Sequence, residues 1–481
     1  DLTRRKLLPA IYSLARDRLL PEQFAVVGYA RRPYTDETFR ERVHEGADNY
    51  ARRKPVDAQL WERFGPSISY CQGNFGDAED YVRLREHLEK VDAERGTRGN
   101  RVFYLATPPS SFATILKNLR EQGLLYDEGD ERHSRVIVEK PFGRNLETAR
   151  ELNTAVSTYL REDQTYRIDH YLGKETVQNI LVFRFANGIF EPLWNRQHID
   201  HVQLTVAENI GMEGRGKFFE EAGILRDIIQ NHLFQILSLM AMEPPVAMEA
   251  NAIRDEKVKL LQALRPVDQE GFENQVIRGQ YVEGSVGGTE AAGYLDEPGV
   301  DPDSKTETYT GFKMFIDNWR WAGVPFYLRA GKRLPKKVAE FAIHFKRAPN
   351  PLFRNHLPQG TNQNILVVRV QPDEGISITF DSKVPGPSMQ IHPLNMEFRY
   401  GEAFGGAPPE AYERLILDCM LGDSTLFIRN DEIELAWKWC DDLLDRWAQP
   451  ETSLHTYKAG SWGPDASDEL LRRDGRRWRR P

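Results

Sequence analysis

The sequence has few cysteines, no long apolar run and no excess of positive charge. Only Cys71, Cys419 and Cys440 occur in 481 residues, which is too few and too scattered for a disulfide framework or a zinc site. No apolar run approaches the roughly 20 residues that a membrane helix needs, and the first residues do not have the pattern of a signal peptide. We therefore expect a cytoplasmic protein with no membrane partner and no metal site.

The charge balance restricts the kinds of ligand. A formal net charge of −8 argues against a general nucleic-acid-binding protein, so any anion site must come from local clustering of basic residues. Residues 472–480 form a basic tail, which we interpret as a frayed terminus or an oligomer contact. We expect no nucleic-acid partner.

The first third of the chain alternates between strand and helix patterns. Apolar strand candidates at 24–29, 102–106 and 136–139 are separated by helical patterns at 81–91 and 112–122, and another helical pattern follows at 146–160. This alternation predicts a parallel, doubly wound, Rossmann-like sheet. Such a sheet usually starts with a strand and a Gly-rich turn before the first helix, whereas residue 1 already lies at a helix start. We therefore expect the first strand to be missing.

Two strand ends in this region carry candidate binding residues. Arg31 and Arg32 stand where an NAD site usually has an acidic residue for the ribose hydroxyls, and this favours the 2′-phosphate of NADP. Lys140 and Pro141 follow the strand at 136–139, and the proline restricts the lysine to an extended conformation. A solvated basic strand end and an ordinary turn remain the alternatives at these two places.

Residues 167–175 concentrate an acid, an imidazole, a phenol and an ammonium beside a glycine. Helical spacing begins directly afterwards, so Gly173 and Lys174 should lie near a helix N-terminus, which attracts anions. His170 and Lys174 add side-chain donors, and the segment predicts a phosphate site. The alternative is a loop-to-helix junction with solvated charges.

The remainder of the chain predicts a different architecture. Strand patterns at 201–208, 341–345, 365–370, 376–380 and 396–400 indicate a mostly antiparallel sheet backed by helices, and such a sheet could support an oligomer. A helix over 227–237 places His232 on its apolar face. A sheltered histidine suits a general base, although most buried histidines only satisfy a hydrogen bond. Residues 329–337 are densely basic and suit an anionic ligand.

Taken together, these segments resemble the glucose-6-phosphate dehydrogenase family in its bacterial form. Residues 167–175 are similar to that family's signature, and residues 1–6, 139–141, 227–232, 329–332 and 413–418 are similar to family blocks in the expected order. The resemblance implies an NADP-binding domain over 1–169 and a substrate-binding and oligomerisation domain over 170–481. It implies oxidation of glucose 6-phosphate to 6-phosphoglucono-1,5-lactone with reduction of NADP, the first step of the oxidative pentose phosphate pathway, in a homodimer or homotetramer.

The resemblance also implies roles for single residues. His232 would be the base and Asp169 its partner. The phosphate would be bound by His170, Tyr171, Lys174 and Lys337, the sugar hydroxyls by Glu208, Asp227 and Lys332, and the cofactor by Arg31, Lys140 and Pro141, with Lys140 also touching the sugar.

One departure from the family leaves alternatives open. Family members have a strand and a Gly-x-x-Gly turn before the aspartate that is residue 1 here, and we interpret the chain as part of a longer protein. About 15 upstream residues of the family type should then restore NADP affinity. Otherwise the chain would be a catalytically impaired sugar-phosphate-binding protein. A different NADP-linked sugar oxidoreductase, of the inositol dehydrogenase or glucose–fructose oxidoreductase kind, is the other enzyme reading.

Overall fold

The computed structural model describes residues 2–267, 271–349, 352–353, 363–405, 408–449 and 452–481, so Asp1 lies outside the described residues. The chain forms two compact units. The first unit comprises Asp1–Glu175, Pro245–Asp255 and Pro409–Glu434, and the second unit comprises Thr176–Pro244, Glu256–Pro408 and Leu435–Pro481. The predicted domain boundary between residues 169 and 170 stays a prediction.

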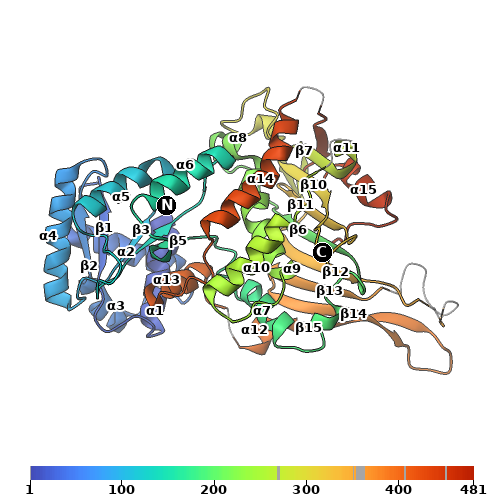
Figure 1. Ribbon diagram of the computed structural model, residues 1–481, viewed down its shortest axis with the longest axis horizontal. Helices are drawn as coiled ribbons and strands as arrows, with labels where there is room; N and C mark the ends of the chain where they lie inside the picture. The colour runs from blue at the N-terminus through green and yellow to red at the C-terminus, as the bar shows by residue number, and fades with distance from the viewer. Residues whose placement is uncertain (1, 268–270, 350–351, 354–362, 406–407, 450–451) are drawn as a thin grey trace. The chain divides into compact units, whose positions relative to one another are not determined.

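Parallel strands form two sheets in the first unit (Figure 1). One sheet pairs β1 (Val26–Ala30) with β2 (Ile68–Gln72), and the other has the order β3 (Arg101–Leu105), β4 (Ser134–Val138), β5 (Thr165–Arg167). The intervening helices are α2 (Asp36–Tyr50), α3 (Ala58–Phe64), α4 (Ala78–Arg95), α5 (Phe112–Glu121) and α6 (Leu146–Ser157). The alternation confirms the predicted Rossmann-like fold class.

A late segment of the chain completes the core of the first unit. The chain starts with a π-helix, η1 (Thr3–Leu7), and continues as α1 (Leu8–Arg16), which packs on α13 (Ala411–Leu421). Leu7, Ala10 and Leu14 bury their side chains with Ile416. Arg52 adds an ion pair with Glu413 at 3.0 Å. The first unit is therefore built from segments that are hundreds of residues apart in the sequence.

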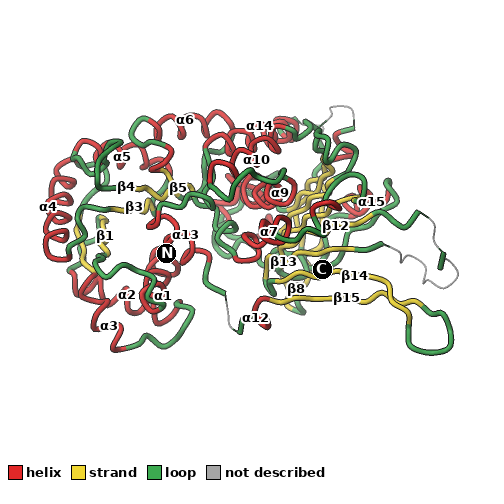
Figure 2. The backbone as a smooth tube through the Cα atoms, turned by 60° about the horizontal axis from the view of Figure 1, so that its bottom comes forward, coloured by secondary structure: helices red, strands yellow, loops and turns green. Residues whose placement is uncertain are grey.

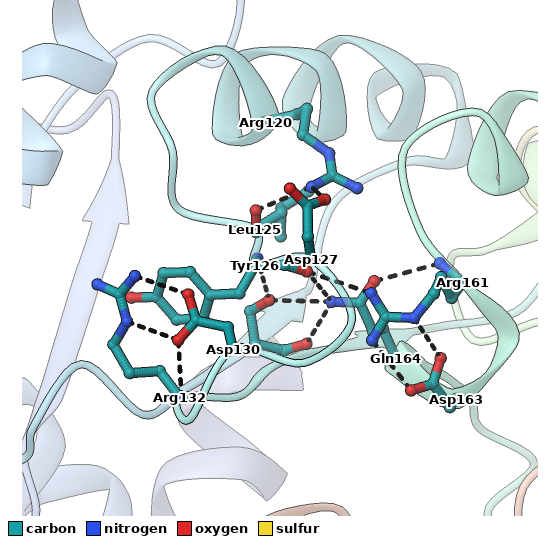
Figure 3. A network of polar contacts seen from close by, with 10 residues as sticks. Arg120, Leu125, Tyr126, Asp127, Asp130, Arg132, Arg161, Asp163 and Gln164 are labelled. Atoms are coloured by element: carbon teal, nitrogen blue, oxygen red, sulfur yellow. Dashed lines mark hydrogen bonds and ion pairs between the residues drawn. The ribbon is translucent and has the colours of Figure 1, made fainter.

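A network of polar contacts holds strand β5 beside strand β4 (Figure 3). The Gln164 amide donates to the Tyr126 carbonyl at 2.9 Å and to the Ser134 hydroxyl at 3.1 Å. That hydroxyl also accepts the Tyr126 N–H at 2.8 Å. Because Gln164 directly precedes β5, these buried hydrogen bonds fix where β5 begins. They therefore help to position the residues that follow β5.

A nine-stranded sheet forms the centre of the second unit (Figure 1). Its strands, from one edge to the other, are β15 (Ile391–Arg399), β14 (Gly375–Lys383), β13 (Ile365–Gln371), β12 (Val338–Phe345), β6 (Ile199–Ala207), β11 (Phe326–Gly331), β10 (Tyr309–Met314), β7 (Val276–Val282) and β16 (His455–Lys458). Among the strands of the described residues, only the pairs β6–β11 and β7–β16 of this sheet are parallel. The prediction of a mostly antiparallel sheet is thus confirmed, and Figure 2 shows the long hairpin of β14 and β15 at its edge.

Helices cover the centre of this sheet. The π-helix η6 (Leu225–Leu233) packs on β6 and β11 and continues as α9 (Phe234–Ala241). Trp439 lies between Phe234 and Phe312 of β10, with ring centroids 5.4 and 5.1 Å away. No helix in the described ranges has the length and apolar character to cross a membrane.

The basic tail is an ordered part of the second unit, so the expectation of a frayed terminus was wrong. Trp478 is 6% exposed and its indole donates to the Ser467 carbonyl at 2.9 Å. The N–H of Arg479 donates to Gln203 of β6 at 2.7 Å, and Arg476 forms an ion pair with Asp200 at 3.0 Å. The tail is held because its arginines meet acidic and amide side chains of the sheet.

Candidate active site

Asp169 is fixed by the turn that follows β5. The strand pairing continues one residue past β5, where the N–H of Ile168 donates to the Val138 carbonyl at 3.0 Å. The chain then turns, and the Asp169 carboxylate accepts the N–H of Tyr171 at 2.9 Å while its carbonyl accepts the N–H of Leu172 at 3.0 Å. Asp169 is 1% exposed. An aspartate that bonds its own turn in this way has a defined side-chain direction.

Three of the four predicted phosphate residues, His170, Tyr171 and Lys174, lie close together. The Lys174 ammonium lies 4.8 Å from the centre of the Tyr171 ring, and the His170 ring packs edge-on to it at 5.0 Å. The His170 ring also lies nearly parallel to the Tyr412 ring, with the two ring centroids 6.4 Å apart. Helix α7 (Glu175–Phe185) begins directly after Lys174, so the predicted helix start is confirmed. The Lys174 ammonium and the His170 ring thus lie beside the start of α7, where the N–H of Thr176 donates to the Glu374 carboxylate at 3.3 Å. A helix N-terminus beside a lysine favours an anion.

Gly173 allows the segment to pack against α13. A Cβ at Gly173 would lie 2.5 Å from the Ala411 carbonyl oxygen, which no ordinary contact tolerates. Gly173 is therefore needed because its backbone lies close to that of Ala411, and not because the position has a positive φ angle. The approach also brings Tyr412 next to His170, a contact that the sequence did not reveal.

Lys140 and Pro141 follow β4 at its carboxyl end, as predicted. The preceding Glu139 accepts a short hydrogen bond from the Tyr104 hydroxyl. Burial raises the pKa of Glu139, while hydrogen bonds from Tyr104 and Tyr412 act in the opposite direction. The peptide bond between Lys140 and Pro141 is cis. A partly buried acid thus lies at the base of the segment that carries Lys140.

Arg31 follows β1 directly and is exposed. Its carbonyl accepts a hydrogen bond from the Gln72 amide at 3.1 Å, which ties the ends of β1 and β2 together. Arg32 is exposed as well and donates to the Tyr34 hydroxyl at 3.4 Å. Two guanidinium groups at the carboxyl end of parallel strands suit a phosphate group on a nucleotide.

In the second unit, Glu208 and Lys332 meet at the ends of two parallel strands. Glu208 follows β6 and Lys332 follows β11, and the last residues of these strands, Ala207 and Gly331, are paired. The Lys332 ammonium forms ion pairs with Glu208 at 2.5 Å and with Asp227 at 3.6 Å. The lysine side chain is 5% exposed and each carboxylate side chain is 22% exposed. One ammonium between two partly exposed carboxylates can bind several hydroxyl groups of a sugar.

Backbone hydrogen bonds hold this cluster rigidly. The N–H of Glu208 donates to the Gly331 carbonyl at 2.9 Å, and the Glu208 carbonyl accepts the N–H of Leu334 at 2.9 Å. The N–H of Lys332 donates to the Thr308 carbonyl at 3.0 Å, and its carbonyl accepts the Tyr457 hydroxyl at 2.7 Å. The cluster is therefore built into the sheet rather than carried by a free loop.

Asp227 and His232 lie on η6, which is a π-helix where the sequence predicted an ordinary helix over 227–237. The hydrogen bonds of a π-helix join residues five apart, so Asp227 and His232 approach the same side of it. His232 is 1% exposed, and its N–H donates to the Asn231 side chain at 2.6 Å. The predicted burial of His232 is confirmed. Single π-turns often occur at functional sites.

Lys337 is exposed and directly precedes β12. Within the basic segment 329–337 the residues thus separate: Arg329 is completely buried, Lys332 is held in the ion-pair cluster, and Lys336 and Lys337 face solvent. An exposed lysine can bind an anionic group of a ligand without a fixed protein partner.

The Rossmann-like fold of the first unit and the polar side chains of the second unit indicate the class of protein. A Rossmann-like unit is typical of dinucleotide binding, and the second unit carries a buried histidine on the same helix as one carboxylate of a carboxylate–lysine cluster. These features together indicate a dinucleotide-dependent dehydrogenase of a polar, anionic substrate.

Comparison with known proteins identifies the family. The model of the glucose-6-phosphate dehydrogenase NAD-binding domain matches residues 1–179, and that of the C-terminal domain matches residues 181–479. The chain is 49% identical to glucose-6-phosphate 1-dehydrogenase of Chlamydia muridarum, over 100% of this chain and 94% of the relative, and 49% identical to glucose-6-phosphate 1-dehydrogenase 2 of Mycobacterium bovis, over 100% and 93%. The chain belongs to the glucose-6-phosphate dehydrogenase family.

Solved structures agree with this assignment. A structure of glucose-6-phosphate dehydrogenase in complex with its substrate glucose-6-phosphate matches with a TM-score of 0.90 at 37% identity, covering 100% of this chain and 96% of that one. The enzyme from Mycobacterium avium matches with a TM-score of 0.84 at 36% identity, again covering 100% and 96%. Both units therefore have the fold of this family.

Proposed function

We propose that this protein oxidises glucose 6-phosphate at C1 to 6-phosphoglucono-1,5-lactone and reduces NADP. The observation that carries the proposal is the match of both family models over nearly the whole chain. The cluster of Lys332, Glu208 and Asp227 supports it, because these side chains offer both donors and acceptors to sugar hydroxyls. The anion site expected at Lys174 suits the phosphate of the substrate.

In the proposed mechanism, His232 removes the proton from the C1 hydroxyl. Its burial excludes water from the imidazole, and proton transfer to a positioned base of suitable pKa accelerates such a step by about 10²–10⁴-fold. Asp169 would pair with His232, fix its tautomer and stabilise the imidazolium. NADP, when bound, accepts the hydride that leaves C1.

The other residues would hold the two substrates in place. His170, Tyr171, Lys174 and Lys337 would bind the phosphate, and Lys140 would contact the sugar and the cofactor together. Holding the sugar carbon close to its hydride acceptor lowers the entropic part of the barrier.

NADP is proposed as the cofactor on the chemistry at the end of β1. Arg31 and Arg32 are exposed there, and guanidinium groups form strong paired hydrogen bonds with phosphate oxygens. Arg31 would bind the 2′-phosphate, and Pro141 would contact the cofactor together with Lys140. A ribose with a free 2′-hydroxyl offers no such anion, so NADP should be preferred over NAD.

A mixture of protein, NADP and glucose 6-phosphate tests the proposal through the absorbance of the reduced nicotinamide. We expect reduction that depends on the sugar phosphate and is absent with unphosphorylated glucose. Calorimetric titration with glucose 6-phosphate alone tests binding separately. Binding without reduction of NADP would contradict the proposal and favour a catalytically impaired sugar-phosphate-binding protein.

The setting and assembly of the enzyme are also proposed. The described cysteines Cys71, Cys419 and Cys440 are free and buried thiols, which suits the reducing cytoplasm.

Strand β15 at the sheet edge exposes Leu394, Met396 and Phe398, and a contiguous apolar surface of this kind suits the interface of a homodimer or homotetramer.

A further inference from the structure

Glu307 binds the start of the π-helix that carries Asp227 and His232. Its carboxylate accepts the N–H of Leu225 at 3.1 Å, and its own carbonyl accepts the N–H of Ile224 at 3.0 Å. The first N–H groups of a helix have no partner within the helix. One residue from a distant part of the chain thus satisfies two of them through both its side chain and its main chain.

Gly223 leaves the space that the Glu307 carboxylate occupies. Its φ angle of +63° interrupts the helical backbone between α8 (Gly216–Ile224) and η6. A Cβ at Gly223 would lie 2.4 Å from one carboxylate oxygen of Glu307 and 2.8 Å from its carboxyl carbon. Any other residue would strain the backbone and displace this carboxylate. Gly223 and Glu307 therefore set the start of η6 together.

The next residue, Thr308, binds the other half of the candidate site. Its carbonyl accepts the N–H of Lys332 at 3.0 Å, and its hydroxyl lies 3.0 Å from that of Tyr457, which also donates to the Lys332 carbonyl at 2.7 Å. The dipeptide of Glu307 and Thr308 thus fixes the helix of Asp227 and His232 on one side and the backbone of Lys332 on the other.

Burying the Glu307 carboxylate costs free energy unless hydrogen bonds replace those that it would make with water. The residue is 5% exposed, and its carboxylate accepts the backbone N–H of Leu225. Desolvation raises the pKa of Glu307, while the hydrogen bond from Leu225 and the charges of Arg226 and Arg278 lower it. A buried carboxylate that depends on backbone N–H groups holds those groups in a narrow range of positions.

We infer that Glu307 is a positioning residue: it sets the start of η6 and thereby the placement of Asp227 and His232 relative to Lys332. Glu307 need not touch the substrate in this role. The inference rests on the proposed function, since it concerns the base and the sugar-binding carboxylate of that reaction. It adds a residue that acts through the π-helix rather than through the ligand.

Three substitutions of buried carboxylates test this role. Glu307→Ala should lower kcat/KM for glucose 6-phosphate on the order of 10- to 10²-fold, the cost of a small misplacement of reacting groups, and leave the KM for NADP unchanged within about twofold. Glu307→Gln should restore most of the activity, because its amide oxygen can still accept the N–H of Leu225. Glu340→Ala is the control: Glu340 is 4% exposed and pairs with Arg479 in the same unit, so its loss should lower the melting temperature without changing kcat.

Two glycine substitutions test the same contact from the other side. Gly223→Ala should imitate Glu307→Ala. Gly323 has a φ of +83°, and a Cβ there would have no atom of the described residues within 4 Å, so Gly323→Ala should leave kcat unchanged. In the Glu307→Ala background, Gly223→Ala should cost less than in the wild type, because the colliding carboxylate is gone. The inference would be overturned if the losses of activity from Gly223→Ala and Glu307→Ala were additive in the double variant. It would also be overturned if Gly223→Ala and Gly323→Ala lowered kcat equally.

Titration with glucose 6-phosphate keeps this test separate from that of the proposed function. If the wild type binds the sugar phosphate but reduces no NADP, the proposed function fails, and a loss of affinity in Glu307→Ala still supports the positioning role because Asp227 lies on the same helix. If the wild type is active and Glu307→Ala matches it in kcat, KM and affinity, the positioning role is wrong. If Glu307→Ala does not fold, the glutamine and glycine variants decide.

Discussion

Replacing Lys332 by methionine should destabilise the second unit and weaken sugar-phosphate binding together. The substitution keeps the length of the side chain but removes the ammonium from between Glu208 and Asp227, which lie 2.5 and 3.6 Å from it. Removing one partner of a buried ion pair costs about 3–5 kcal/mol. Each carboxylate side chain is 22% exposed, so water can still solvate it after the substitution. We therefore expect a loss of stability at the lower end of this range, about 3 kcal/mol.

Thermal unfolding and calorimetric titration measure the two effects. A loss of about 3 kcal/mol corresponds to a fall in melting temperature of roughly 6 °C or more for a unit of this size. Loss of a charge-assisted hydrogen bond to a sugar hydroxyl, about 1.5–3 kcal/mol, should raise the Kd for glucose 6-phosphate by about 10- to 100-fold. The KM for NADP should stay the same, because Lys332 is proposed to contact only the sugar.

Two control variants separate stability from binding. Lys332→Met combined with Glu208→Gln should recover part of the stability, since both charges of the closest pair are gone, yet it should not recover affinity. Lys313→Met removes a similarly short ion pair, to Asp474 at 2.6 Å, away from the candidate site and should leave affinity intact. A Lys332→Met protein with wild-type stability, or a double variant with wild-type affinity, would refute the reasoning.

Three further predictions concern catalysis, pH and assembly. His232→Ala should lower kcat on the order of 10²-fold or more with little change in affinity, whereas Lys174→Ala should mainly raise KM, and equal steady-state kinetics would contradict this division of roles. Burial lowers the pKa of His344 from 6.5 to about 3, so the unfolded chain binds the proton first, and the free energy of unfolding should fall as pH drops below about 6.5, by up to about 1.4 kcal/mol per pH unit. His344→Gln should flatten this slope in urea unfolding curves, and an unchanged slope would exclude His344 as its source. Met396→Lys on the exposed side of β15 should reduce the mass measured by light scattering, and an unchanged mass would exclude this face as the interface.

The strands that the sequence predicts are those with continuous or alternating apolar residues. Strands β1, β3, β4, β6 and β12–β15 fall at or near the predicted ranges. Strand β7 was missed because Arg278 and Gln280, both 6% exposed, interrupt its apolar pattern. The Arg278 guanidinium is buried by donating to the carbonyls of Trp447, Thr452 and Ser453. Such partners are more than 160 residues away and cannot be read from a local pattern.

The candidate site was predictable in its residue types but not in its assembly. Local signals, such as Asp169 before a helix start and His232 on an apolar face, indicated where chemistry could occur. The contact of Glu208 with Lys332 depends on the parallel pairing of β6 with β11, which joins residues 124 positions apart. The π-helical form of η6 could not be predicted from the sequence either, because apolar spacing predicts a helix without specifying which carbonyl accepts each N–H.

The basic segment 329–337 shows why a run of charge in the sequence is not one site. Successive side chains of a strand point to opposite faces, so Arg329 of β11 turns towards the tail, where it lies 4.4 Å from the centre of the Trp478 ring and donates to the Arg479 carbonyl at 2.7 Å. Burial lowers its pKa, as expected for a cation that supports packing rather than ligand binding. Lys332 follows the strand end and joins the ion-pair cluster, and Lys337 lies beyond the turn in solvent. The strand therefore divides one basic segment between Arg329, which supports packing, and Lys332 and Lys337, which are proposed to bind the sugar and the phosphate. Only the two proposed roles should respond to glucose 6-phosphate.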